Sequence, residues 1–133
     1  MEASQALKDV DEKDVGFRLG PRINAAGRMD HANVAFKLLM AETEPEAIQL
    51  AEQLNQNNLD RQKLTERLIV EARTQIADTK QAKNSIIFVL GDGWSTGILG
   101  LIASRVKDEF GRPTYVMGLN NNLITGSGRS VDR

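Results

Sequence analysis

The residues of this sequence best suited to chemistry are Gly126, Ser127, Gly128, Arg129 and Ser130. The glycines allow positive φ and close approach to a ligand, and successive backbone N–H groups there can form a nest for an anion. The two hydroxyls and the planar guanidinium add further donors, so phosphate is the natural ligand of such a loop. It is not a Walker loop, because the Gly-Lys-Ser/Thr ending and the following helix are absent. The alternative is a glycine-rich hairpin or bulge with an exposed arginine.

A second candidate site is the segment 91–100, which contains four glycines as well as Trp94 and Ser95. The glycines are Gly91, Gly93, Gly97 and Gly100. We place it where a parallel strand passes into a helix, the usual ligand position in α/β sheets. The N–H groups at a helix start also attract anions. Trp94 could stack on a nucleobase, and the alternative is that it covers the edge of the sheet. The glycines let the helix come close to the sheet or to a ligand.

A third candidate is the segment 21–28, which places Arg22, Asn24 and Arg28 among small residues. Small residues permit close packing, and arginine binds phosphate through two parallel hydrogen bonds. The alternative is that these arginines form structural ion pairs.

The elements around this third segment are expected to be short. Gly-Pro at 20–21 and Ala-Gly at 26–27 are chain breakers, so we expect residues 23–25 to be irregular or briefly extended. Asp30 then caps a helix over residues 31–41, which has an apolar stripe.

A long helix is predicted next. Residues 43–46, Thr-Glu-Pro-Glu, combine a capping box with proline in the first turn, and neither glycine nor proline recurs before residue 79. At ~1.5 Å per residue a helix over 44–79 would run roughly 50 Å, which indicates a bridge between two bodies. The alternative is two helices, broken near Asn57 and Asn58.

The remainder reads as strand, helix, strand and strand, at residues 85–91, 97–110, 114–117 and 123–125. The first strand is apolar on both faces, as in a buried parallel strand, and the βαβ unit predicts a right-handed crossover. The fold class is therefore α/β. Three strands and one helix make a thin core, so we expect supporting strands outside this chain. The exposed edge of such an incomplete sheet is a candidate surface for dimerisation.

Composition limits the function. The chain has 133 residues, 41% apolar and 26% charged, without an apolar run of ~20 residues or a signal peptide. We therefore expect a cytoplasmic protein that does not bind membranes. The absence of cysteine excludes disulfides, thiolate zinc sites and cysteine nucleophiles. A net charge of −1 argues against general polyanion binding, and with one histidine, His31, a metal centre would be nearly all carboxylate.

Five sequence patterns together resemble the RecJ family of single-stranded-DNA-specific exonucleases, in the DHH phosphoesterase superfamily. Each pattern is weak alone, but their order, spacing and content agree over nearly the whole chain. They are Gly-Pro-Arg-Ile-Asn-Ala-Ala-Gly-Arg-Met at 20–29, Leu54-Asn55 with Asn58-x-x-Arg61-Gln62, Trp94-x-x-Gly97-Ile98-Leu99-Gly100-Leu101-Ile102-Ala103-Ser104-Arg105, Gly111-Arg112-Pro113, and residues 126–130.

The resemblance implies a longer parent protein. Its N-terminal DHH domain would bind two divalent metals, Mn or Mg, and a long helix would lead to a DHH-associated domain with a mixed sheet. Residues 1–43 would then be the tail of the catalytic domain, residues 44–80 the connecting helix, and residues 84–133 the truncated start of the associated domain. The metal-ligand motifs are not in this sequence. We therefore expect this fragment to contain no catalytic residue, to bind no metal and to be inactive alone.

The family's activity is hydrolysis of single-stranded DNA from its 5′ end by metal-activated water, which releases 5′-mononucleotides in DNA recombination and repair. Carried over, Ser127 and Arg129, with the glycines at 126 and 128, would hold the 5′-phosphate of the DNA partner. Arg28, with Arg22 and Asn24, would face the DNA groove.

One position departs from the family pattern. Family members usually have histidine directly after the tryptophan that corresponds to Trp94, and Ser95 stands there in this chain. Serine can donate a hydrogen bond to phosphate but cannot carry a proton at neutral pH, which puts an acid–base role at this position in doubt.

Two other functions fit the sequence. One is a DHH phosphoesterase that acts on cyclic dinucleotides or short RNA, and a preference for long strands would decide against it. The other is a non-catalytic nucleic-acid-binding module, which would bind strands regardless of their 5′ end. The segment 21–28 favours RecJ.

Overall fold

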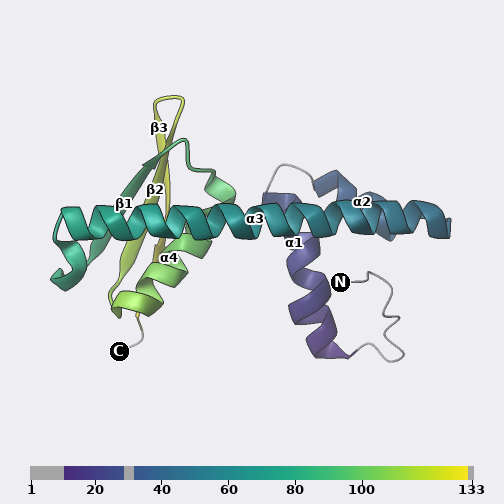
Figure 1. Ribbon diagram of the computed structural model, residues 1–133, viewed down its shortest axis with the longest axis horizontal. Coiled ribbons are helices and arrows are strands. Elements are labelled where there is room, and N and C mark those ends of the chain that lie inside the picture. Colours follow the sequence, from purple (N-terminus) through teal and green to yellow (C-terminus); the bar gives the residue numbers. More distant parts are fainter. Residues whose placement is uncertain (1–10, 29–31, 132–133) are drawn as a thin grey trace. The chain divides into compact units, whose positions relative to one another are not determined.

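The computed structural model describes residues 11–28 and 32–131, with the side chains of Ala26, Arg28 and Ala32 left out. The chain divides into two compact units, Met1–Gln62 and Lys63–Arg133, and the division falls within α3. The elements (Figure 1) are η1 (Asp14–Leu19), α1 (Gly20–Arg28), α2 (Ala32–Leu39), α3 (Glu44–Asp78), η2 (Gln81–Lys83), β1 (Ile87–Asp92), α4 (Thr96–Phe110), β2 (Thr114–Asn120) and β3 (Leu123–Arg129).

Helix runs through residues 23–25 of the first unit, where an irregular or extended segment was expected. The π-helix η1 runs directly into α1, so the expectation for residues 23–25 is wrong. Pro21 lies in the first turn of α1, where a missing N–H is tolerated, and the wider π turn before it gives the proline ring room. Arg22 Nη1 donates to the Arg18 carbonyl, and so bonds a backbone acceptor close to the proline.

Helices α2 and α3 confirm the next two predictions. Ala35 of α2 and Leu54 of α3 are buried together, with Val34 and Leu38 packed against them. The long helix α3 is a single unbroken element of 35 residues. The predicted cap Asp30 lies outside the described residues.

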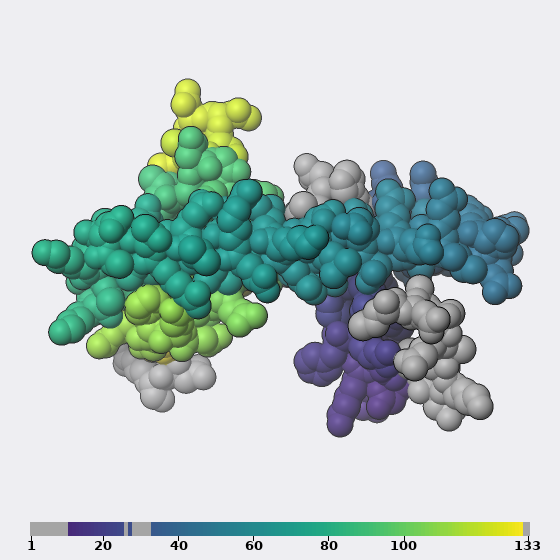
Figure 2. All heavy atoms as spheres, in the orientation of Figure 1, coloured from purple at the N-terminus to yellow at the C-terminus, as the bar shows by residue number. Residues whose placement is uncertain are grey.

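The second unit contains a three-stranded mixed sheet in the order β1-β2-β3. β1 and β2 are parallel, β2 and β3 are antiparallel, and α4 covers one face of the sheet (Figure 1). The α/β fold class and the parallel βαβ unit are therefore confirmed. Gly111 ends α4 with φ of 61°, the left-handed conformation for which glycine is suited. The turn between β2 and β3 projects from this unit (Figure 2).

The core of the second unit lies between the sheet and two helices. Its fully buried members include Ile76 of α3, Ile87 and Val89 of β1, Ile102 of α4 and Val116 of β2. The other sheet face is open to solvent, so the expectation that β1 is buried on both faces is wrong.

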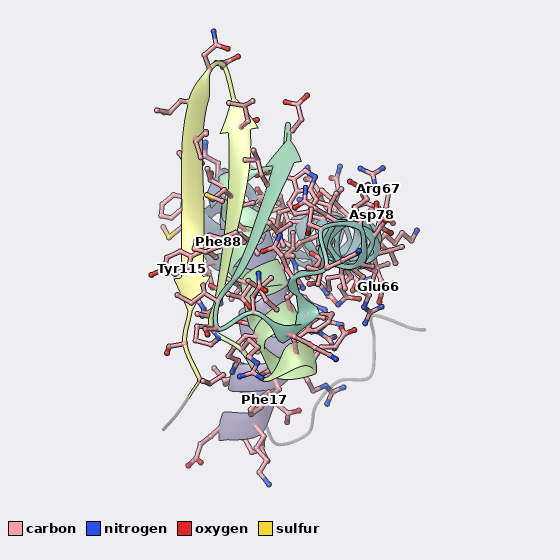
Figure 3. The ribbon with its side chains drawn as sticks, turned by 90° about the vertical axis from the view of Figure 1, so that its left-hand side faces the viewer. Phe17, Glu66, Arg67, Asp78, Phe88 and Tyr115 are labelled. Carbon is pink, nitrogen blue, oxygen red and sulfur yellow. The ribbon has the colours of Figure 1, made fainter. Side chains whose placement is uncertain are left out.

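On that open face, Phe88 and Tyr115 stack with their ring centres 5.7 Å apart and are about half exposed (Figure 3). Leu90 of β1 is 42% exposed beside them. The alternating burial of β1 follows from helices that cover one side of the sheet only.

Candidate nucleic-acid interface

Residues 126–129 belong to a strand and not to a ligand-cradling loop. In β3, Gly126 pairs with Met117, Ser127 with Val116 and Gly128 with Tyr115 of β2. The expected anion nest of positive-φ glycines is therefore wrong, and the hairpin alternative describes the segment. The reason is the turn before it, where Asn121 and Asn122 have φ of 49° and 61°. Such a turn joins two antiparallel strands directly. β3 is therefore paired with β2 from Leu123 onward, before the motif at 126–129 is reached.

The glycines of the motif make room for side chains of β2. A Cβ atom at Gly128 would lie 2.8 Å from Cε1 of Tyr115, and one at Gly126 would lie 3.0 Å from Cγ of Met117. Both glycines are on the open face of the sheet, since side chains alternate between faces along a strand. Packing across the two strands thus explains these two glycines.

The serine and arginine of the motif lie on the opposite face, toward α4. Arg129 Nη1 donates to Ser127 Oγ at 3.0 Å and to the Gly128 carbonyl at 2.8 Å. Both side chains meet α4 at Gly100, where an added Cβ would lie 2.9 Å from Arg129 Nη2 and 3.2 Å from Ser127 Oγ. Within residues 11–28 and 32–131, Arg129 forms no ion pair. The structure thus gathers a hydroxyl and a guanidinium beside a glycine of α4, and this guanidinium has no carboxylate partner among the described residues.

Thr125 is a polar residue of this face that the sequence analysis did not assign to the site. It precedes Ser127 by two positions, and its Oγ1 is buried without a hydrogen-bond partner in the described part of the chain. An alternating sequence pattern could have identified it. Polar side chains at 125, 127 and 129 alternate with small or apolar residues, which indicates that the polar ones share one face of a strand.

Trp94 is a core residue, only 6% exposed. A Cβ at Gly91 would lie 1.9 Å from Cδ2 of its ring, so the indole lies directly over this glycine. Gly118, the register partner of Gly91, similarly leaves space for the Trp94 carbonyl, which accepts a bond from Asn120 Nδ2 at 2.9 Å. Little ring surface remains for a base, and the burial favours the alternative that Trp94 covers the edge of the sheet, since Gly91 belongs to the outer strand β1.

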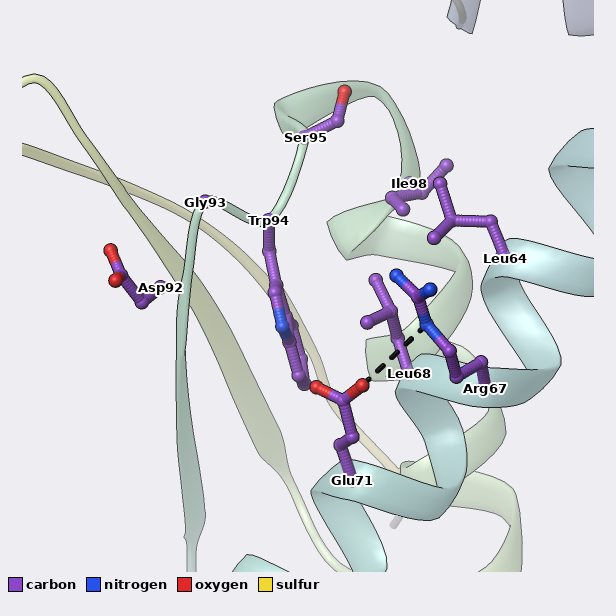
Figure 4. Close-up of a pocket in the computed structure, with 9 residues that line it drawn as sticks. All are labelled: Leu64, Arg67, Leu68, Glu71, Asp92, Gly93, Trp94, Ser95 and Ile98. Atoms are coloured by element: carbon purple, nitrogen blue, oxygen red, sulfur yellow. Dashed lines mark ion pairs between the residues drawn. The ribbon is translucent and has the colours of Figure 1, made fainter.

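A small cavity of about 160 Å³ lies beside Trp94 (Figure 4). Arg67 and Glu71 border it with an ion pair of 3.6 Å. Ser95, at the start of α4, is exposed and its side chain makes no capping bond. The complete lining is Leu64, Arg67, Leu68, Glu71, Asp92, Gly93, Trp94, Ser95 and Ile98.

The remaining predicted site residues belong to the first unit. Arg22 Nε donates to Asn55 Oδ1 at 3.3 Å, which joins α1 to α3. Asn24 is exposed on α1, and the side chain of Arg28 lies outside the described residues. Arg22 is thus bonded to neutral acceptors and forms no ion pair within the described part of the chain.

Metal ligands do not gather in the described residues, where no group of three or more His, Asp or Glu side chains could hold a metal ion. No helix in this part of the chain is both long and apolar enough to cross a membrane.

Known proteins are similar to this chain in sequence and in fold. No profile of a protein family matches the chain. The single-stranded-DNA-specific exonuclease RecJ of Bacillus subtilis is 37% identical over 127 residues, 94% of this chain and 16% of the relative. RecJ of Escherichia coli is 32% identical over 133 residues, 97% of this chain and 23% of the relative. The chain is homologous to one segment of RecJ.

Solved RecJ structures agree with this. A crystal structure of exonuclease RecJ bound to manganese matches with a TM-score of 0.76 and 30% identity, over 90% of this chain and 29% of that one. RecJ from Thermus thermophilus in complex with Mg²⁺ matches with a TM-score of 0.75 and 31% identity, over 89% of this chain and 18% of that one. The chain thus spans about a fifth of the curated RecJ relatives that it matches.

Proposed function

We propose that this chain is a segment of a 5′-to-3′ single-stranded-DNA exonuclease of recombination and repair, and that its β3 strand recognises the 5′-phosphate of the DNA. The observation that carries the second part is the contact between Arg129 Nη1 and Ser127 Oγ on the face of β3 toward α4. The first part is supported by the similarity to RecJ.

The chemistry of this pair suits a terminal phosphate. The guanidinium has five N–H donors in a planar fork that matches two phosphate oxygens, and the serine hydroxyl can donate to a third. A terminal phosphate carries more negative charge than an internal diester. Arg129 has no carboxylate partner among the residues that the structure describes, so its charge favours the end of the strand. The strand scaffold holds both side chains on one face.

Divalent metal is part of the proposed parent activity, since solved RecJ structures contain Mg²⁺ or Mn²⁺. The residues described here do not fit such a site, because their carboxylates and imidazoles do not cluster. We propose that residues other than these hold the metal, and that this chain alone does not hydrolyse DNA.

The test compares binding of short single-stranded oligothymidylate with a 5′-phosphate or a 5′-hydroxyl to the 133-residue chain. Charge-assisted hydrogen bonds contribute about 1.5–3 kcal/mol, so the phosphorylated end should bind roughly tenfold or more tightly. Arg129→Ala should remove this preference. Arg112→Ala is the matched control, because it deletes an exposed arginine of the same unit outside the proposed site.

Other outcomes assign other functions. Equal binding of both ends would contradict end recognition and favour a non-catalytic binding module. Displacement of oligothymidylate by cyclic dinucleotides that bind more tightly than oligothymidylate itself would favour the small-substrate phosphoesterase. If Arg112→Ala also lost the preference for the 5′-phosphate, the preference would come from the overall positive charge of the unit and not from a specific site at Arg129.

A further inference from the structure

Gly100 lies in the interior of α4, where glycine is among the least favourable residues for a helix. The atoms nearest to a Cβ at this position would be Arg129 Nη2 at 2.9 Å, Ser127 Oγ at 3.2 Å and Arg129 Cζ at 3.7 Å. All three are side-chain atoms, and no backbone atom of β3 is among them. The missing side chain therefore makes room for two functional groups of β3, the Arg129 guanidinium and the Ser127 hydroxyl.

We propose that Gly100 is a positioning residue for 5′-phosphate recognition: it keeps the guanidinium of Arg129 in place against α4, where Nη1 reaches Ser127 Oγ. This inference rests on the proposed function. On one side Arg129 is bonded to Ser127 Oγ and the Gly128 carbonyl, and on the other it lies against the helix. A side chain fixed on both sides loses less conformational freedom when a ligand binds.

A methyl group at position 100 would disturb the arginine and spare the fold. At 2.9 Å from Nη2 it would lie inside normal contact distance, so one of the two must move. Nη2 is the far end of a long flexible side chain, whereas position 100 belongs to a packed helix next to the buried Leu99. The guanidinium therefore moves. Alanine also has the higher helix propensity, so Gly100→Ala should weaken phosphate recognition while thermal stability stays equal or rises.

The first experiment is a double-mutant cycle on the complete chain, with Gly100→Ala, Arg129→Ala and the combination. The readout is the ratio of affinities for 5′-phosphorylated and 5′-hydroxyl oligothymidylate. We expect Gly100→Ala to lower this ratio several-fold and to have no further effect when Arg129 is already alanine, because both changes act through one group. Gly16→Ala is the matched control: it adds the same methyl to a helical glycine with nothing within 4 Å, and should leave the ratio unchanged.

A second readout does not depend on DNA. In NMR spectra of the free protein, the Nε–Hε signal of Arg129 should shift in Gly100→Ala and stay in place in Gly16→Ala. An unshifted signal, an unchanged affinity ratio, or an equal loss in the Arg129→Ala background would each overturn the positioning role. If the unmodified chain shows no 5′-phosphate preference, the proposed function fails and with it the role in recognition. The NMR signal then still decides whether Gly100 holds Arg129 in place.

Discussion

The side-chain amide of Gln75 in α3 pairs with the backbone of Leu90 in β1. Its Nε2 donates to the Leu90 carbonyl at 3.0 Å, and its Oε1 accepts from the Leu90 N–H at 2.9 Å. Gln81 makes the same two bonds with Phe88, at 3.0 and 2.9 Å. β1 is an outer strand of the sheet, and these bonds are those that a neighbouring strand would form. The two glutamines therefore close this edge.

Gln75→Ala should lower the free energy of unfolding by about 1–3 kcal/mol, because two hydrogen bonds of about 0.5–1.5 kcal/mol each are lost. Hydrogen exchange at the Leu90 amide should accelerate at the same time. Gln53→Ala is the control, an exposed glutamine on the same helix. Equal effects of the two substitutions on stability and on the Leu90 amide would show that the pairing contributes nothing.

Removing both glutamines should make the chain self-associate. An outer strand with free N–H and C=O groups can pair with another chain, and the apolar Phe88 and Leu90 would lie at that edge. The double variant Gln75→Ala/Gln81→Ala should thus sediment as larger species than the unmodified chain at the same concentration. A monomeric, folded double variant would contradict this protective role.

Gly91→Ala should strongly destabilise the second unit. The new Cβ would lie 1.9 Å from the Trp94 ring, and the ring is packed in the core and cannot move aside. Overpacking of this kind costs about 1–3 kcal/mol or more, measurable by urea unfolding. Trp94→Ala makes room, so Gly91→Ala should cost less in that background. An undiminished cost there would mean that the strain has another source.

Local signals predicted most of the architecture. The capping box at Thr43 and the lack of later glycine or proline indicated the long helix α3, and Gly111 marked the end of α4. These features act within a few residues of their own positions, so the sequence alone expresses them.

Features that depend on neighbours could not be predicted in this way. Residues 126–130 have a composition typical of a nest, but pairing with β2 decides the conformation of residues 126–129. Gly20 and Pro21 suggest a break, although the preceding π turn carries the helix through them. The closure of β1 by Gln75 and the contact of Gly100 with Arg129 join positions 15 and 29 residues apart. No local pattern encodes such contacts.

Asp14 should titrate below its ordinary range. Arg18 Nη1 donates to Asp14 Oδ1 at 2.9 Å, and this hydrogen bond holds the pKa of the carboxyl below its usual 3.8. A lowered folded-state pKa stabilises the fold above the unfolded pKa, and this contribution is lost as the pH falls through the folded pKa. NMR titration of the Asp14 carboxyl should therefore give a midpoint below 3.8, and Arg18→Gln should raise it. An unchanged midpoint in Arg18→Gln would disprove the assignment to this pair.

Substitution by valine should have opposite effects on stability at two threonines that lie on the same face of the sheet. Thr114 is fully buried, and its Oγ1 donates to the Arg112 carbonyl at 3.0 Å, so Thr114→Val should cost about 1–2 kcal/mol. Thr125 Oγ1 is buried without a partner among the described residues, so Thr125→Val removes only a desolvated hydroxyl and should leave stability unchanged or higher. Urea unfolding of both variants measures the difference. A loss in Thr125→Val as large as that in Thr114→Val would mean that this hydroxyl is hydrogen-bonded in solution, for instance to a buried water beside Ser127.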